Sequence, residues 1–222
     1  MTLKSGAWVT PAGHQVTMEY RDDTTDWNTI AAILTSDEYG LPHDQVGVFL
    51  DVGAHIGAWS IGAAIDNPGS TVVAIEALPE NAELVQRNSD LNHAGVIVLN
   101  NAAGTNGRVL YGTSDTEFER QHRFIGGADW HGATSAAIEL PTLSLSAIVK
   151  KYGPVRLLKI DCEGCEWSFL DDPAISDVAE VVGEYHPREG NLPARLRELL
   201  EPTHVVTLDD AEPFGAFRAV RR

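Results

Sequence analysis

The sequence has few cysteines and lacks a long hydrophobic run. Its 222 residues contain only two cysteines, Cys162 and Cys165, which are too few for the disulfide framework of a secreted domain. The first residues lack the apolar core of a signal peptide, and no apolar stretch is long enough to cross a bilayer. We therefore expect a cytoplasmic protein with reduced cysteines and no membrane partner.

Basic residues are also scarce. Lysine and arginine together number 16 against 32 aspartates and glutamates, so the formal net charge is −16. A surface this negative repels phosphate groups, and we expect no nucleic-acid partner. Hydrophobic residues make up 43% of the chain and charged residues 22%, as in ordinary globular proteins. This length and composition predict one globular domain with an insertion.

The N-terminal segment, residues 1–44, is expected to form a short ribbon followed by a helix. Val16, Met18 and Tyr20 alternate with polar residues, which is typical of a strand. Asp26 stands where an acidic side chain can cap a helix. The remainder, residues 45–222, is expected to form the main domain, with the glycine-rich segment 104–140 as a β-hairpin and a long loop inserted in it.

From residue 47 the pattern alternates between apolar strands and helices, which predicts an α/β fold with a mostly parallel sheet. The last two strands are expected to pair antiparallel. The predicted strands cover 47–52, 71–76, 96–99, 155–160, 178–184, 204–208 and 214–220. The predicted helices cover 55–65, 79–91, 144–151, 165–170 and 191–200.

A glycine-containing turn follows the first of these strands. Gly53 and Gly57 form a Gly-x-x-x-Gly spacing directly after Asp51, at the carboxyl end of a strand, where open α/β sheets bind ligands. A dinucleotide site needs an additional middle glycine beside the pyrophosphate. The spacing therefore favours a nucleoside-methionine ligand, and the alternative is a tight turn without a ligand.

Two further segments complete the predicted cofactor site. Glu76 ends the second strand about twenty residues after the glycine turn, where a carboxylate can accept both hydroxyls of a ribose. The alternative is an ordinary solvated acid at a strand end. Asn101 and Ala102 follow the third strand and are expected to flank an adenine, although a plain turn is nearly as good an interpretation.

Acids and a histidine gather at the ends of the fourth and fifth strands. Asp161 and Glu163 are two residues apart in an extended segment, so their side chains point the same way. They can deprotonate a hydroxyl, hold a divalent cation or fix the loop. Glu184 and His186 share one side of the next strand end, and His186 is a candidate general base. A metal-assisted alternative places Mg²⁺ among Asp161, Glu163 and Glu184.

The two cysteines form a Cys-x-x-Cys sequence between these acids. A redox pair or half of a zinc site is one interpretation. The sequence offers no second pair to complete a zinc site and no thioredoxin-like beginning. We therefore expect Cys162 and Cys165 to be small buried residues that fill the core.

These segments, in this order, resemble the FkbM family of S-adenosylmethionine-dependent methyltransferases over residues 16–186. The most specific motif is the family's Leu-Lys-Ile-Asp-x-Glu-Gly-x-Glu, which is intact at 158–166. The cofactor loop is similar at 51–57, with His55 in place of the usual asparagine. The family's Glu-Pro-x-Pro-Glu-Asn stretch is similar to residues 76–81, with Ala77 in place of proline.

The resemblance implies a Rossmann-like class I methyltransferase fold with a seven-stranded, mostly parallel sheet, an antiparallel last strand and helices on both faces. It implies O-methylation of a sugar or secondary-metabolite hydroxyl on a small-molecule or glycan acceptor, with residues 1–44 covering the cofactor pocket. Asp161, Glu163 and His186 become the candidate catalytic residues. The candidate S-adenosylmethionine-binding residues are Asp26, Tyr39, Asp51, Gly53, His55, Gly57, Glu76, Ala77, Asn101, Ala102 and Asp161.

Two other functions are compatible with the same motifs. A binding module would keep the cofactor site without catalysis, and the intact acids at 161 and 163 argue only weakly against it. A nicotinamide-dependent oxidoreductase is the second alternative, but the missing middle glycine argues against that function.

Overall fold

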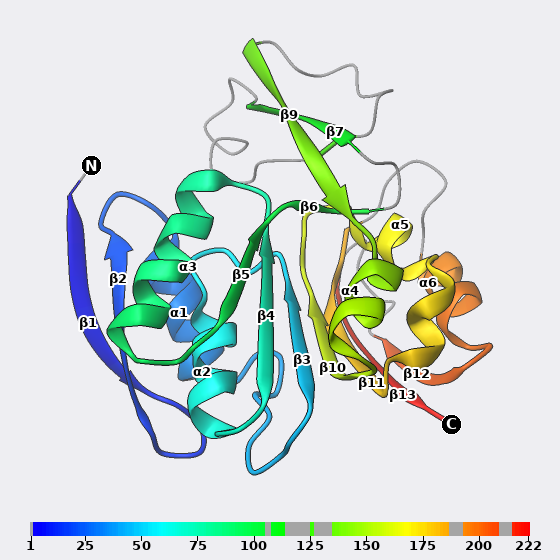
Figure 1. The fold of residues 1–222 in the computed structure, drawn as a ribbon, viewed down its shortest axis with the longest axis horizontal. Coiled ribbons are helices and arrows are strands. Elements are labelled where there is room, and N and C mark those ends of the chain that lie inside the picture. The colour runs from blue at the N-terminus through cyan, green and yellow to red at the C-terminus, as the bar shows by residue number, and fades with distance from the viewer. Residues whose placement is uncertain (1, 105–107, 114–124, 127–134, 187–192, 209–214) are drawn as a thin grey trace. The chain divides into compact units, whose positions relative to one another are not determined.

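The computed structural model describes residues 2–104, 108–113, 125–126, 135–186, 193–208 and 215–222. The chain divides into two compact units, Met1–Asn100 and Asn101–Arg222. Figure 1 labels their helices and strands. No helix among the described residues is both long and apolar enough to cross a membrane.

The first unit begins with an antiparallel hairpin and a helix. Strands β1 (Leu3–Val9) and β2 (Gln15–Arg21) pair, and α1 (Asp26–Leu34) follows. The side chains of Val16 and Met18 are fully buried, so the strand predicted from their alternation is confirmed. The prediction that Asp26 caps the helix is wrong, because Thr25 precedes the first helical residue and the Asp26 carboxylate binds Arg21.

The core of the first unit is a parallel three-stranded arrangement with two helices. Strands β3 (Val48–Val52), β4 (Thr71–Glu76) and β5 (Ile97–Asn100) pair in that order. Helices α2 (Ala58–Asp66) and α3 (Pro79–Leu91) connect them (Figure 1). The strand side chains at the centre are fully buried, which explains why the strands are continuous apolar runs.

The larger group of paired strands in the second unit has one parallel and two antiparallel pairings. Strand β10 (Val155–Ile160) pairs parallel with β11 (Glu180–Tyr185), β11 pairs antiparallel with β13 (Gly215–Arg221), and β13 pairs antiparallel with β12 (His204–Leu208). The expected antiparallel pair at the end of the chain is therefore confirmed. The helices of this unit are α4 (Leu145–Tyr152), α5 (Glu166–Leu170), a 3₁₀ turn (Pro173–Asp177) and α6 (Pro193–Leu200).

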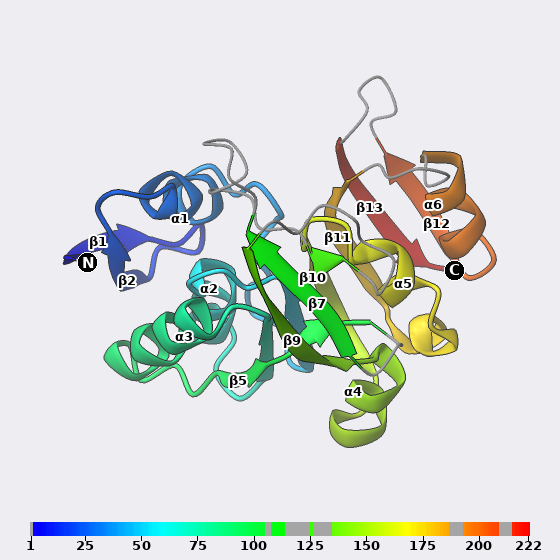
Figure 2. The same ribbon diagram turned by 90° about the horizontal axis from the view of Figure 1, so that it is seen from above.

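The predicted insertion contributes strands of its own. Strands β6 (Ala102–Ala103), β9 (Ser135–Leu143), β7 (Arg108–Thr113) and β8 (Ile125–Gly126) form a sheet in that order. Figures 1 and 2 show β9 beside β7, with which it pairs antiparallel. The segment expected as a loop near residue 135 is thus a strand, and the other residues of the predicted loop lie outside the described residues.

Three strands of the first unit and four of the second supply the seven strands predicted for the central sheet. Most of their pairings are parallel, and the last strand runs antiparallel to its neighbours. The predicted α/β fold with a seven-stranded, mostly parallel sheet is confirmed. The division between residues 1–44 and 45–222 stays a prediction.

Candidate functional site

The glycine turn after β3 is built from left-handed backbone. Gly53, His55 and Gly57 have φ values of 76°, 54° and 92°. A Cβ on Gly57 would stand 3.0 Å from Val85 Cγ1 on α3. Gly57 therefore lets this turn approach helix α3 closely. The turn places the backbone N–H of His55 next to Glu76, the last residue of β4.

Glu76 is a buried carboxylate held by the loops around it. Its oxygens accept hydrogen bonds from the backbone N–H groups of His55 at 2.8 Å and Leu78 at 2.9 Å. Asn81 Nδ2 lies 3.5 Å from the same side chain. Burial raises the pKa of Glu76 above its ordinary value. Asn100 donates to the carbonyl oxygens of Glu76 and Ala77 and so fixes the segment that follows the strand.

These groups fit the ribose of an S-adenosyl ligand. A ribose diol offers two O–H donors, and a carboxylate can accept both of them. The Asn81 Oδ1 atom is buried beside Glu76 and has no hydrogen-bond partner among the described residues. An unpartnered buried acceptor is costly unless a ligand or water supplies a donor. Neither Asn81 nor Asn100 was among the predicted cofactor residues, although Asn81 ends the stretch 76–81 that resembles the family motif and Asn100 begins the segment expected to flank the adenine.

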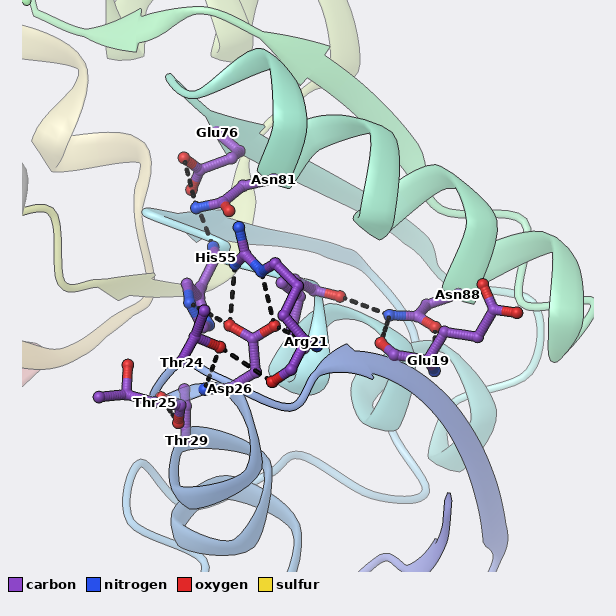
Figure 3. A network of polar contacts seen from close by, with 11 residues as sticks. Glu19, Arg21, Thr24, Thr25, Asp26, Thr29, His55, Glu76, Asn81 and Asn88 are labelled. Atoms are coloured by element: carbon purple, nitrogen blue, oxygen red, sulfur yellow. Dashed lines mark hydrogen bonds and ion pairs between the residues drawn. The ribbon is translucent and has the colours of Figure 1, made fainter. Parts of the chain in front are cut away.

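Asp26 is the centre of a buried ionic network that includes the glycine turn (Figure 3). Its carboxylate accepts hydrogen bonds from Arg21 Nε and Nη2, both at 2.8 Å, and from the Arg21 backbone N–H. His55 Nε2 lies 3.2 Å from the other side of the same carboxylate. Burial alone would raise the pKa of Asp26, but the bonds from His55 and Arg21 hold it well below its ordinary value.

The network indicates a role for Asp26 that differs from the one predicted from the sequence. The residue is fully buried and reaches the turn through the His55 side chain, whereas the sequence led us to expect direct contact with the cofactor. His55 in turn joins two acids, since its ring contacts Asp26 and its backbone N–H binds Glu76. Three of the predicted site residues are therefore brought together in one chain of contacts.

The other predicted cofactor residues are distributed over both units. Asp51 is fully buried and accepts a hydrogen bond from Ser60 Oγ at 2.6 Å, which ties the strand end to α2. Tyr39 and Ala77 are buried in the first unit. Asn101 belongs to the second unit, where its Nδ2 lies 3.4 Å from the Pro141 carbonyl oxygen. Ala102 is buried in β6. Their roles toward the cofactor stay predictions.

The second unit carries a separate cluster at the carboxyl ends of β10 and β11. His186 Nε2 lies 3.4 Å from Glu163 Oε2 and 4.0 Å from Asp161 Oδ1. These three residues are the group among the described residues whose ligand atoms come close enough to hold a metal ion. Glu184, expected as a third metal ligand, does not belong to that group. The sequence predicted these three residues together as catalytic candidates, whereas the predicted metal site had Glu184 in the place of His186.

Glu166 binds the Nδ1 atom of His186 and so holds its ring in place. It is fully buried, and its Oε1 accepts hydrogen bonds from His186 Nδ1 and from the Cys162 backbone N–H, both at 3.0 Å. Trp167 Nε1 donates to the His186 carbonyl oxygen at 2.8 Å. Because one ring nitrogen is held by Glu166, the other is directed toward Asp161 and Glu163.

The charge of His186 follows from its three acidic neighbours. Burial by itself lowers the pKa of the imidazole, but the hydrogen bond to Glu166 and the charges of Glu166, Glu163 and Asp161 raise the pKa of His186 to about 9. The ring is therefore an imidazolium at neutral pH. Such a ring donates hydrogen bonds and has no lone pair to accept a proton.

The cysteines are buried as expected but not reduced. Cys162 and Cys165 form a disulfide, with their Cα atoms 5.5 Å apart. The expectation of reduced core-filling cysteines is wrong because the two residues between them, Glu163 and Gly164, adopt φ values of 56° and 102° and turn the chain back on itself. The Cys-x-x-Cys spacing was the available signal for this bond.

The sequence and the fold agree with one family of proteins. A model of the methyltransferase FkbM domain matches residues 51–205. A comparison with curated proteins found no match. Precorrin-6y C5,15-methyltransferase from Geobacter metallireducens GS-15 aligns with a TM-score of 0.50 at 14% identity, over 91% of this chain and 93% of that chain.

Two further solved structures align over most of the chain. The C-terminal domain of precorrin-6Y C5,15-methyltransferase from Rhodobacter capsulatus gives a TM-score of 0.49 at 12% identity, over 91% of this chain and 93% of that chain. TrmK from M. capricolum, in complex with S-adenosylhomocysteine, gives 0.44 at 10% identity, over 88% and 67% of the two chains. At 14% identity, the Geobacter structure indicates similarity of fold and not of substrate.

A glycine turn after one parallel strand and a buried acid at the end of the next define a Rossmann-like class I methyltransferase fold. The family match covers most of the sequence, and the chain belongs to the methyltransferase FkbM domain family. The family match shows that the protein is a methyltransferase. The alternative of a nicotinamide-dependent oxidoreductase is therefore set aside.

Replacement of Asp26 by asparagine should strongly destabilise the fold. The change leaves the buried Arg21 guanidinium without its counter-charge, and breaking a buried pair typically costs about 3–5 kcal/mol. Asp22→Asn is the matched control, because the side chains of the Lys4–Asp22 pair are about half exposed and exposed ion pairs contribute little to stability. Urea denaturation measures both. Equal effects of the two variants would contradict a central role for Asp26.

His186 should make the stability depend on pH. Folding raises the pKa of His186 from 6.5 to about 9, so the folded protein binds this proton more tightly than the unfolded chain. The contribution is fully present below pH 6.5 and is lost as the pH rises through 9. The free energy of unfolding of the wild type relative to His186→Gln should therefore fall between pH 6.5 and about 9.

Urea denaturation at a series of pH values tests this expectation. His43→Gln, at an exposed position, controls for the removal of a histidine. A stability difference between the wild type and His186→Gln that rises over this pH range would show that the acids do not hold the imidazolium.

Proposed function

We propose that this protein methylates a hydroxyl oxygen of a small-molecule or glycan acceptor, such as a sugar or a secondary metabolite. The observation that carries the proposal is the cluster of Asp161, Glu163 and His186. A hydroxyl becomes a good nucleophile only as it loses its proton, and two partly exposed carboxylates beside a fixed cation form a suitable proton acceptor.

The cofactor end of the site is assigned to the first unit. S-adenosylmethionine, when bound, supplies a methyl group on a positively charged sulfur. Glu76 and Asn81 would bind the ribose hydroxyls, and the turn at Gly53 and Gly57 would let the ligand approach the backbone. Asp26 acts as a positioning residue, since it holds the His55 side chain and with it the turn.

The acceptor end is assigned to the second unit, with Asp161 as the base. His186 was the other candidate, but its Nδ1 is bound to Glu166 and the ring carries a proton at neutral pH. Asp161 lies farther from the imidazolium than Glu163, so its carboxylate is less committed to that ion pair. His186 then serves to hold the two carboxylates in place. A general base typically contributes about 10²–10⁴-fold in rate.

A metal-assisted version of this reaction is the second candidate. One nitrogen and two carboxylate ligands lie close enough together to hold a divalent ion, and carboxylates suit Mg²⁺. Asp161, Glu163 and His186 would hold such an ion, which would lower the pKa of the acceptor hydroxyl, and His186 would have to lose its proton to bind it. The expected cytoplasmic location and the expected absence of a nucleic-acid acceptor stay predictions.

Binding of S-adenosylhomocysteine tests the cofactor end. Glu76→Gln keeps the size of the side chain but removes its charge, and a lost hydrogen bond to a charged group should raise the Kd about 10–100-fold. Glu80→Gln, an exposed position at the start of α3, is the matched control and should leave the Kd unchanged. Calorimetry with and without Mg²⁺ gives both values. Unchanged affinity in Glu76→Gln would refute the ribose assignment.

Transfer of a labelled methyl group tests the acceptor end. We expect the wild type to methylate members of a panel of sugars and hydroxylated small molecules, and Asp161→Asn to lower turnover by about 100-fold or more with little change in S-adenosylhomocysteine affinity. Asp171→Asn, at an exposed position, is the control. Full turnover by Asp161→Asn would exclude it as the base. Full binding of the cofactor product without transfer to any acceptor would favour the non-catalytic binding module.

A further inference from the structure

The Cys162–Cys165 disulfide encloses part of the acidic cluster. The bond closes a ring over only two intervening residues, Glu163 and Gly164. Asp161 directly precedes the ring and Glu166 directly follows it. These are the only cysteines in the sequence, so no other disulfide can form within the chain.

The small ring argues for a local role of the bond. The entropy that a disulfide removes from the unfolded chain grows with the length of the loop it closes, and this loop is close to the shortest possible. Its main effect is therefore on the conformation of the residues inside it. Glu163 has a φ of 56°, in the left-handed region that non-glycine residues rarely adopt.

The conformation of Glu163 determines one distance in the cluster. Its carboxylate oxygen lies 3.4 Å from His186 Nε2. The amide of Cys162, at the start of the ring, is bound to the same Glu166 oxygen that holds the other nitrogen of His186. Opening the ring would release Glu163 to a more common backbone conformation and loosen both connections.

We propose that Cys162 and Cys165 form a reversible redox-modification site that sets the position of Glu163 against His186. The proposal rests on the proposed role of this cluster at the acceptor end. The disulfide form holds the cluster assembled, and the dithiol form lets Glu163 move away. The reductant is a dithiol, and the oxidant is a low-molecular-weight disulfide.

The chemistry is ordinary thiol–disulfide exchange. A thiolate of the reductant attacks the sulfur of Cys162, the more exposed of the two cysteines. The bond between the protein sulfurs breaks, and Cys165 leaves as a thiolate that takes up a proton. The second thiol of the reductant then displaces the Cys162 thiol and closes the reductant's own disulfide. Two electrons and two protons pass to the protein, and a low-molecular-weight disulfide reverses the change.

Thiol counting on the full chain tests reversibility. The protein is purified in air and alkylated with iodoacetamide, either directly or after reduction with dithiothreitol. Its mass is then measured by mass spectrometry. We expect no alkylated cysteine before reduction, two after it, and none again once dithiothreitol is replaced by oxidised glutathione. Free thiols in the air-purified protein, or a reduced form that does not reoxidise, would overturn the proposal.

Hydrogen exchange on the same samples tests the effect on the cluster. Reduction should speed exchange in a peptide covering residues 158–167 by about tenfold or more, because the Cys162 amide loses its fixed partner. A peptide covering β4 in the first unit should not change. Exchange in 158–167 that is identical in the two redox states would also overturn the proposal.

A double variant controls for direct effects of the reductant. Cys162→Ser/Cys165→Ser should exchange as fast in this peptide as the reduced wild type, and dithiothreitol should not alter it. If the variant does not fold, the comparison of oxidised and reduced wild type decides the question alone. S-adenosylhomocysteine binding is measured in parallel, so failure of the cofactor assignment is seen separately from failure of the redox assignment.

Discussion

A buried carboxylate has to be surrounded by hydrogen-bond donors, and this requirement organises both loops that carry the chemistry. Glu76 ends β4 inside the first unit and takes backbone N–H groups from the turn after β3 and from the segment before α3. Glu166 begins α5 inside the second unit and takes a backbone N–H from the loop after β10. Each loop is held by a charge that water cannot reach, so each can keep a conformation that its own residues would not favour.

The left-handed residues show the consequence of this support. His55 and Glu163 both have positive φ values, and each lies in a loop whose amides bind one of the buried acids. Histidine tolerates this region somewhat better than most residues do, and glutamate has no such advantage. The loop at Glu163 has a covalent ring in addition, whereas the loop at His55 has glycines on either side. The additional covalent constraint is therefore found in the loop of Glu163, the residue that is less suited to a left-handed conformation.

Much of the fold could be predicted from the sequence because its strands are continuous apolar runs and its helices start at clear signals such as Pro79. The glycine spacing and the acid at residue 76 likewise predicted where the first loop and its carboxylate meet. The contacts made by Asp26 could not be predicted, since a helix cap and a buried ion pair use the same residue type at the same position. The choice depends on Arg21 and on His55, a residue 29 positions away that local patterns do not reveal. The disulfide was missed for a similar reason, because it depends on two left-handed residues whose conformation composition alone does not indicate.

Burial affects the two predicted ends of the site differently. At Glu76 the surrounding donors are neutral backbone and amide groups, so burial dominates and the carboxylate is made less acidic. At His186 the surrounding groups are three carboxylates, so their charge outweighs burial and the imidazole keeps its proton. The first environment suits an acceptor that exchanges hydrogen bonds with a ligand's hydroxyls. The second suits proton transfer, because a fixed imidazolium holds two carboxylates close together. The difference between mainly neutral neighbours at Glu76 and charged neighbours at His186 therefore supports the proposal that the first unit binds the ligand and the second handles the proton.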